Sequence, residues 1–379
     1  MSFSWNSGGQ YVTYPQKAPL ILLTKQPVQL ETPRHCFLSP FTPNSSFYVR
    51  WHLNSLSSSV NLSEWRLNLE GNVKKPMWLS MSNLLGRFKP ASIVAVNQCS
   101  GNSRSRFQPS VSGGQWGNGA MGNATWTGVR LKELLDVAGI KKHSIMVQFE
   151  GMDRGKGGKG VGANKFLKSL GLDNPVLDKC LIAYRMNDKP LPMLNGFPAR
   201  LVVPGYFATY WVKALTSIRV LDKPDDNYWM KSAYRVPNTP RGNTTPQDIR
   251  TGKVKFLPID RMPVRSFIIA PDGSSELPRG KQVKLHGIAL SGHDRVVKVE
   301  VSSGDGTMWS EAQLGEDFGA YSFRTWEFTW TPARLGSHVL SVRATDGQGN
   351  VQPDGGIWNP GGYMWNKIES QEMVVSTSI

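Results

Sequence analysis

The last third of the chain alternates apolar and polar residues in short runs between turn sequences, and no other feature restricts the fold as much. A period of two is typical of β-strands with one buried face. Turn signals such as PDG at 271–273 and DG at 346–347 separate the runs. The alternating runs occupy residues 266–269, 283–289, 296–302, 325–329 and 338–344. This pattern predicts an all-β, immunoglobulin-like sandwich of roughly seven antiparallel strands.

The preceding part of the chain mixes short predicted strands with a few helices. The spacing of apolar residues predicts helices at 79–85 and 129–138, the second ending at Gly139. A further helix is expected at 165–170. Glycine (38 residues) and proline (25 residues) are frequent among the 379 residues, which favours strands and ordered loops over helical bundles.

These patterns together predict an α+β chain in three parts. Residues 1–30 are expected to form an extended segment, because they contain prolines and only one short apolar run. Residues 31–250 are expected to form a domain of mixed strands and helices. Residues 251–379 are expected to form the sandwich. A stretch rich in Pro, Asn and Thr comes before it and predicts a linker that crosses from one domain to the other.

The formal net charge of +16 favours an anionic substrate or an acidic partner. The basic residues are spread along the chain, so we expect no nucleic-acid partner. No apolar run approaches the length that spans a membrane, and the N-terminus shows no signal peptide. We therefore expect either a cytoplasmic chain or one from which an export signal has been removed.

One of the three cysteines stands in a sequence that favours chemistry. Cys99 follows the apolar run 93–96, a predicted strand, and small residues and two arginines, Arg104 and Arg106, come directly after it. Nearby guanidinium groups stabilise a thiolate and attract anions, so Cys99 fits a metal ligand or a nucleophile beside an oxyanion site. The alternative is an inert, buried thiol. No disulfide framework is expected from Cys36, Cys99 and Cys180.

Several motifs, taken in order, resemble those of the sulfite oxidase family of molybdenum enzymes, most of all the catalytic molybdenum subunit of bacterial sulfite dehydrogenases. The resemblance covers residues from about 30 to 370. The motifs are TPN at 42–44, FYVRWH at 47–52, VNQCSGNSR at 96–104, GNGAMGNATW at 117–126, NGFPARLVVPG at 195–205 and WNPGGYM at 358–364. The resemblance implies a sulfite-oxidase-type molybdopterin domain followed by the sandwich, which would mediate dimerisation.

The resemblance also implies a site. It implies a molybdenum–molybdopterin cofactor whose metal is bound by Cys99, a soft ligand suited to such a metal. The positions that match cofactor-holding residues are His52, Asp153, Asn195, Arg200 and Lys213, and those that match the substrate pocket are Arg50, Arg104 and Tyr234. Two positions depart from animal relatives: Asn195 replaces a histidine, and Gly361 replaces a further arginine, for which Lys231 is a candidate substitute.

The activity implied is the oxidation of sulfite to sulfate, with electrons passed to an external acceptor, a c-type cytochrome subunit. A homodimer and a periplasmic location are implied in the same way. The alternatives are an oxygen-dependent sulfite oxidase, a sulfoxide reductase, a nitrate reductase and a metal-free binding module.

Overall fold

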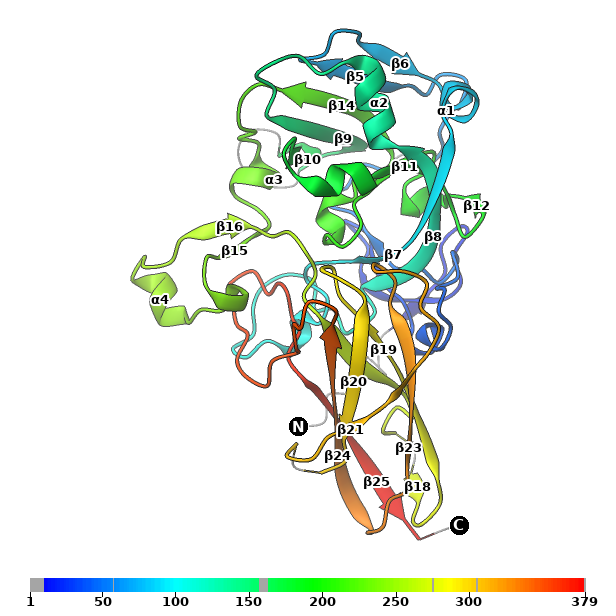
Figure 1. The fold of residues 1–379 in the computed structure, drawn as a ribbon, viewed down its shortest axis with the longest axis vertical. Helices are drawn as coiled ribbons and strands as arrows, with labels where there is room; N and C mark the ends of the chain where they lie inside the picture. Colours follow the sequence, from blue (N-terminus) through cyan, green and yellow to red (C-terminus); the bar gives the residue numbers. More distant parts are fainter. Residues whose placement is uncertain (1–9, 57, 157–162, 275, 305, 378–379) are drawn as a thin grey trace.

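The computed structural model describes residues 10–56, 58–156, 163–274, 276–304 and 306–377, which form an elongated molecule (Figure 1). Strands β5, β6, β9, β10 and β14 lie at the top of the view, and a sandwich of later strands forms the narrower lower part. Strands β7 and β8 cross the region between them. The expected α+β class, a mixed unit followed by a β-sandwich, is confirmed.

The first part of the molecule contains three larger sheets. The N-terminal sheet is β1 (Tyr11–Val12), β2 (Leu20–Thr24), β3 (Gln29–Glu31) and β4 (Val49–Arg50). A second sheet has the order β10 (Lys165–Gly171), β9 (Met146–Arg154), β14 (Leu215–Leu221), β5 (Leu67–Gly71) and β6 (Met77–Leu79). The third has the order β12 (Lys189–Pro190), β11 (Leu181–Met186), β8 (Met121–Arg130) and β7 (Pro90–Gln98), and β13 (Arg200–Val202) also pairs with β11.

Strand β7 positions Cys99, because the strand ends directly before this residue. It pairs antiparallel with β8 along its whole length, from Pro90 opposite Val129 to Gln98 opposite Met121. Its first half is partly exposed, whereas its last four residues are buried. A strand that is paired throughout and buried at its end holds the next residue in a fixed place.

The helices are short. They are α1 (Met81–Arg87), α2 (Leu131–Ala138), α3 (Tyr228–Lys231) and α4 (Pro246–Arg250), and the 3₁₀ turns are η1 (Arg34–Leu38), η2 (Arg104–Arg106), η3 (Pro175–Lys179), η4 (Met193–Asn195), η5 (Ala208–Tyr210) and η6 (Pro240–Gly242). Ser80 precedes helix α1 as its N-cap, and its side chain accepts a hydrogen bond from the Asn83 amide in a capping box. Helix α2 ends at Gly139, which adopts a positive φ of 67°. Both correspond to expected helices.

The helix expected at 165–170 is wrong, because this segment is strand β10. All five central residues of β10 are buried, so the strand has no polar face to give a period of two. Lys168 lies among them and is fully buried. Spacing alone could not separate this strand from a helix, and pairing with β9 decides the outcome.

The sandwich consists of two packed sheets, and we call strands β17–β25 the C-terminal sandwich. One sheet has the order β17 (Arg265–Ala270), β19 (Val283–Leu290), β23 (Arg324–Trp330) and β22 (Gln313–Leu314). The other has the order β18 (Glu276–Pro278), β25 (Glu369–Ser376), β24 (Gly336–Asp346), β20 (Val296–Ser302) and β21 (Ser310–Glu311). Each of the five alternating runs lies on one of these strands, and their inward residues form a separate apolar core.

The connection between β24 and β25 leaves the sandwich and returns to the first part of the molecule. Met364 donates a backbone hydrogen bond to the Ser100 carbonyl (3.0 Å), and Thr244 donates one to the Trp358 carbonyl (2.8 Å). A short hairpin of β15 (Arg235–Pro237) and β16 (Phe256–Pro258) lies beside α4 on one side of Figure 1. The β24–β25 connection therefore contacts the loop that comes after Cys99.

Candidate functional site

Most of the residues expected to form a site line one cavity at the end of β7. The empty space in this cavity, including part that is open to solvent, is about 410 Å³. The expected residues that line it are Arg50, His52, Cys99, Asn195, Arg200, Lys213 and Tyr234. An open cleft adjoins it, and Arg104 lines that cleft together with Arg50, Cys99 and Tyr234. Asp153 lines neither space but is buried, with 3% of its surface exposed.

Cys99 lies where the cavity and the cleft meet. Its amide donates to the Ala120 carbonyl (2.9 Å), and its own carbonyl accepts from the Asn102 amide (3.0 Å) in a turn. The Asn102 side chain fixes this turn, since its amide oxygen accepts from the Ala120 amide (2.9 Å) and its nitrogen donates to the Asn118 carbonyl (3.1 Å). The thiol, 7% exposed, therefore faces both spaces from a rigid support.

Buried positive charge dominates the cavity. Burial lowers the pKa of Lys213 to about 7 and that of Arg200 to about 10. Burial, and then the charges of Arg50 and Lys213, hold the pKa of His52 well below its usual range, so this imidazole is neutral. Asp153 is the carboxylate whose charge acts on Lys213, and burial raises the pKa of Asp153. Uncompensated buried cations are costly, so this cavity suits an anionic ligand.

Several buried polar atoms in the cavity have no hydrogen-bond partner among the described residues. They are the Nδ1 atom of His52, the Nδ2 atom of Asn97, the Oγ atoms of Ser100 and Thr209, and the Nε atom of Arg200. Buried polar groups are normally satisfied, so such a set indicates a bound group with many hydrogen-bonding atoms. A pterin with a phosphate has these atoms, and one thiolate beside it can bind the metal. The residues present therefore fit a molybdopterin cofactor.

Three of these side chains were not expected from the sequence. Asn97 and Ser100 lie within two residues of Cys99 in a motif already quoted, so the sequence could have indicated that they belong to the site. Thr209 lies in η5 and carries no signal in the sequence. Aromatic support was missed as well: His52 stacks on Phe166 of β10, with ring centroids 3.8 Å apart.

Asn195 is held by a lysine from the N-terminal segment. The Nζ atom of Lys17 donates to Asn195 Oδ1, to the Asn44 carbonyl (2.7 Å) and to the Phe47 carbonyl (3.0 Å). The Asn195 Nδ2 atom donates to the Tyr48 carbonyl (3.1 Å). The described residues of the segment expected to be extended (10–30) thus include the sheet strands β1–β3 and contribute Lys17, whose pKa burial lowers to about 7.

In the cleft, Arg104 is held in one orientation. Its Nε and Nη2 atoms donate to the Gly361 carbonyl (3.3 and 3.1 Å), and its Nη1 atom donates to the Gly114 carbonyl (3.1 Å). The guanidinium lies over the Tyr363 ring, 5.4 Å from its centroid. That ring in turn stacks on Tyr234 at 5.6 Å. The β24–β25 connection therefore forms one wall of the cleft.

The geometry at residue 361 explains the missing arginine. A Cβ atom added to Gly361 would lie 2.3 Å from the Tyr363 ring, so any side chain at 361 would have to displace that ring. Lys231, the candidate substitute, lines the same cleft but is exposed. Gln29 also lines it, with a buried Oε1 atom that has no partner among the described residues.

Comparison with known proteins identifies the family. Residues 54–229 match the family model "Oxidoreductase molybdopterin binding domain", and residues 257–372 match "Mo-co oxidoreductase dimerisation domain". Sulfite oxidase of Gallus gallus is 33% identical over 366 residues, covering 92% of this chain and 77% of that protein. The chain belongs to the sulfite oxidase family. A mitochondrial sulfite oxidase of Rattus norvegicus is 30% identical, covering 98% of this chain and 69% of the relative.

A solved structure of similar fold supports the architecture of this sulfite oxidase family chain. The sulfane dehydrogenase SoxCD of Paracoccus pantotrophus superposes with a TM-score of 0.78 at 24% identity, covering 98% of this chain and 90% of the other. The expected molybdenum–molybdopterin cofactor is confirmed by the family match. Within the described residues, no helix is long and apolar enough to cross a membrane.

The buried lysines predict how the stability of the cofactor-free protein depends on pH. Burial lowers the pKa of Lys168 from 10.5 to about 7, so between these values the unfolded chain binds more protons than the folded chain. Stability should therefore rise with pH across this window, by up to about 1.4 kcal/mol per pH unit for each such lysine. Lys168→Met should remove one such contribution and raise the melting temperature at pH 7.

The measurement is thermal unfolding of the cofactor-free protein at pH 7, 8 and 9. Lys132→Met is the matched control, because Lys132 is exposed and pairs with Asp136 on α2. This control should keep the pH dependence of the parent. An unchanged pH dependence in Lys168→Met would show that Lys168 is protonated and compensated in the folded state.

Proposed function

We propose that this chain oxidises sulfite to sulfate at a molybdenum–molybdopterin cofactor. The observation that carries the proposal is the meeting of two spaces at Cys99, a cation-lined cavity that fits the cofactor and an arginine-lined cleft that fits a small dianion. The names of the relatives, sulfite oxidases of animals and plants, support the same reaction. We assign the catalytic domain to residues 31–250 and the dimerisation-type domain to residues 251–379.

In this proposal the first group of residues holds the cofactor. Cys99 supplies the thiolate ligand of the metal, and the neutral imidazole of His52 offers a ring nitrogen to the pterin. The cofactor-holding residues are His52, Asp153, Asn195, Arg200 and Lys213. Arg200 and Lys213 offset the negative charge of the phosphate, which in turn offsets their burial. When bound, the metal supplies the two-electron redox chemistry.

The second group binds the substrate. Sulfite becomes sulfate by gaining one oxygen from water, with the release of two protons and two electrons. Arg50 and Arg104 bind the oxyanion through charge-assisted hydrogen bonds. Tyr234 donates a hydrogen bond from its phenol, because burial raises the pKa of Tyr234 and keeps it protonated. Hydrogen bonds from Arg104 to two backbone carbonyls hold the plane of its guanidinium group in place. The N–H groups that make no such bond therefore point in a set direction.

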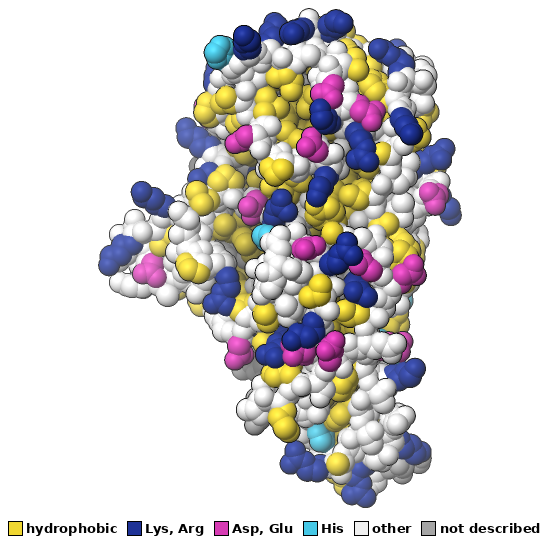
Figure 2. Space-filling model, in the orientation of Figure 1, with side chains coloured by type: hydrophobic (Ala, Val, Ile, Leu, Met, Phe, Trp, Pro, Cys, Tyr) yellow, Lys and Arg dark blue, Asp and Glu magenta, His cyan; other side chains and the backbone are white. Residues whose placement is uncertain are grey.

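The electron acceptor we propose is an external c-type cytochrome, and the location we propose is the periplasm. A homodimer formed through the C-terminal sandwich is part of the same proposal, supported by the dimerisation family match. Lysine and arginine side chains are spread over the face shown in Figure 2 and are not gathered in one patch. With a net charge of +16, such a surface attracts an acidic partner over a distance set by the ionic strength.

Replacing the thiolate tests the metal ligand. Cys99→Ser exchanges a soft ligand for a hard one at nearly constant volume, so we expect a folded protein whose sulfite-dependent ferricyanide reduction falls by at least about two orders of magnitude. Molybdenum and pterin content are measured in parallel. Cys180→Ser, at a buried thiol outside both spaces, is the control and should keep activity and metal. Near-normal turnover in Cys99→Ser contradicts the assignment.

Removing one guanidinium tests substrate binding. Arg104→Met should raise KM for sulfite roughly ten- to a hundredfold, as expected for the loss of a charge-assisted contact, with molybdenum content unchanged. Arg87→Met, at an exposed arginine at the end of α1, is the control. Steady-state kinetics decide, and an unchanged KM and kcat in Arg104→Met would contradict the role of this residue.

The dependence of turnover on ionic strength tests the proposed electron acceptor. Turnover with cytochrome c should fall as the ionic strength rises, whereas turnover with a small neutral acceptor should change little. Reduction of the cytochrome is followed by absorbance, and oxygen consumption and peroxide are measured beside it. Rapid oxygen consumption with stoichiometric peroxide and no cytochrome reduction would make the protein an oxygen-dependent oxidase instead.

A further inference from the structure

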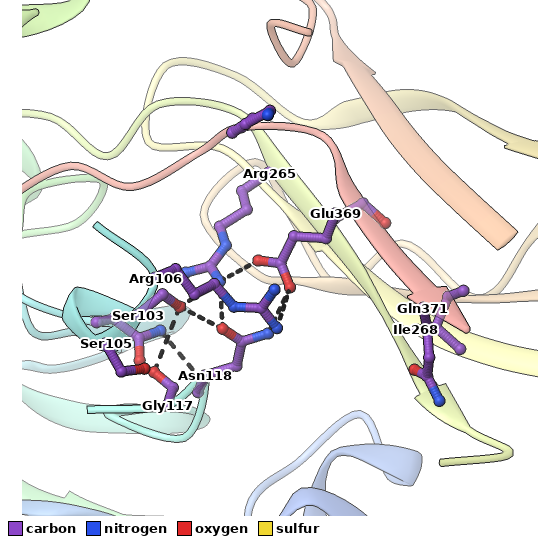
Figure 3. A network of polar contacts seen from close by, with 12 residues as sticks. Ser103, Ser105, Arg106, Gly117, Asn118, Arg265, Ile268, Glu369 and Gln371 are labelled. Atoms are coloured by element: carbon purple, nitrogen blue, oxygen red, sulfur yellow. Dashed lines mark hydrogen bonds and ion pairs between the residues drawn. The ribbon is translucent and has the colours of Figure 1, made fainter. Parts of the chain in front are cut away.

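A buried ion cluster joins the C-terminal sandwich to the loop that carries Arg104 (Figure 3). Arg265 of β17 and Glu369 of β25 form its centre, with the Arg265 Nη2 atom 2.5 Å from Glu369 Oε1. Their side chains are 1% and 5% exposed. The other carboxylate oxygen of Glu369 lies 3.0 Å from Arg106 Nη2. One carboxylate thus bridges two guanidinium groups that belong to different parts of the molecule.

The same pair also contacts the neutral residues of the loop. The Arg265 Nη2 atom donates to Ser103 Oγ (2.6 Å) and to Asn118 Oδ1 (2.7 Å), and Asn118 Nδ2 donates to Glu369 Oε2 (2.7 Å). Ser103 and Asn118 are hydrogen-bonded to each other through their side chains. Figure 3 shows these groups converging between the loop and the two strands. The cluster therefore holds the loop at several points.

These points flank Arg104 directly. Ser103 precedes it and Arg106 lies two residues after it, and the three residues 104–106 form η2. Ser103 has a φ of 64°, a left-handed conformation that a serine adopts at a cost unless its surroundings fix it. The contacts of Ser103 with Arg265 and Asn118 supply that restraint. The direction in which Arg104 leaves the backbone thus depends on residues of the C-terminal sandwich.

We propose that Arg265 and Glu369 are positioning residues that set the affinity of the site for its oxyanion by holding the Ser103–Arg106 segment. The inference rests on the proposed role of Arg104 as an oxyanion ligand. It gives the C-terminal sandwich a part in substrate binding. Neither residue lines the cofactor cavity or the substrate cleft, so both act on the oxyanion indirectly, through the segment that carries Arg104.

The test compares Glu369→Gln with Arg104→Met and with the double variant, in the cofactor-loaded enzyme. Glu369→Gln should raise KM for sulfite about three- to tenfold with kcat within about twofold, in the range for one member of a polar network. Molybdenum content should not change. In the Arg104→Met background the same substitution should leave KM unchanged, because the group that it positions is gone. Additive effects on KM would overturn the proposal.

Glu300→Gln is the matched control. Glu300 of β20 pairs with Arg343 of β24 within the same sandwich but outside the loop contacts, with 2.9 Å between Oε2 and Nε. This variant should keep the parental KM. A KM raised as much in Glu300→Gln as in Glu369→Gln would show a general effect of weakening the sandwich and would overturn the proposal.

Two readouts do not depend on turnover. Sulfate binding to the protein, measured by calorimetry, should weaken in Glu369→Gln by the same factor as KM. Amide hydrogen exchange at residues 103–107 should become faster, while exchange in β20 and β24 stays at the parental rate. If the parent lacks sulfite oxidation but binds sulfate, and the variant loses that binding, the proposed reaction fails and the positioning role stands. Unchanged sulfate affinity and exchange would overturn the positioning role.

Ser103→Ala provides a second route if Glu369→Gln does not fold. It removes the hydroxyl that Arg265 contacts and leaves the Arg265–Glu369 pair intact, so no buried charge loses its counter-ion. We expect Ser103→Ala to raise KM less than Glu369→Gln does, again with kcat nearly unchanged. A folded Ser103→Ala with parental KM and parental exchange at 103–107 would overturn the proposal.

Discussion

Buried positive charge around Cys99 is the constraint to which the rest of the site responds. Arg50, Arg200 and Lys213 lie in or beside one cavity, and burial outweighs every other influence on the Lys213 and Arg200 pKa values. Such charges are costly to bury unless an anion offsets them or, for a lysine, the proton is lost. In the proposed holoenzyme the cofactor phosphate offsets them in the cavity, and the substrate dianion does so in the cleft. Cofactor loading and folding stability are therefore linked by mass action.

The connection between β24 and β25 completes the site on its open side. Arg104 belongs to the loop after β7, but two of its three backbone contacts are to Gly361, in the connection between β24 and β25. Tyr363 of that connection lies under the guanidinium and stacks on Tyr234. The part of the chain that matches a dimerisation domain thus also shapes the substrate cleft. A catalytic domain cut after residue 250 would lose these contacts.

The sequence predicted those features that short-range patterns encode. The alternating runs located strands of the sandwich, and the motif around Cys99 located the strand end at the site, because both depend on neighbours in the chain. Strand β10 was missed because it is buried on both faces and has no alternation. Lys17, Phe166 and Thr209 were missed because they reach the site only through tertiary packing, which no local spacing records. The sequence predicted the charged residues that lie within the quoted motifs, but not the residues that orient them from other parts of the chain.

Gly361 stands where animal relatives have an arginine, and its carbonyl orients Arg104 in place of adding a further positive charge. The Tyr363 ring fills the space that a side chain at 361 would need, so a third guanidinium is excluded by packing. Instead, the Gly361 carbonyl accepts from Arg104, and the ring supports its plane. Lys231 remains exposed at the cleft, where water and salt screen its charge, so it can attract an anion but adds little to the affinity of the bound state. In the proposed function, oxyanion affinity depends on how firmly Arg104 is held, and its orientation depends on the β24–β25 connection and on the Arg265–Glu369 pair.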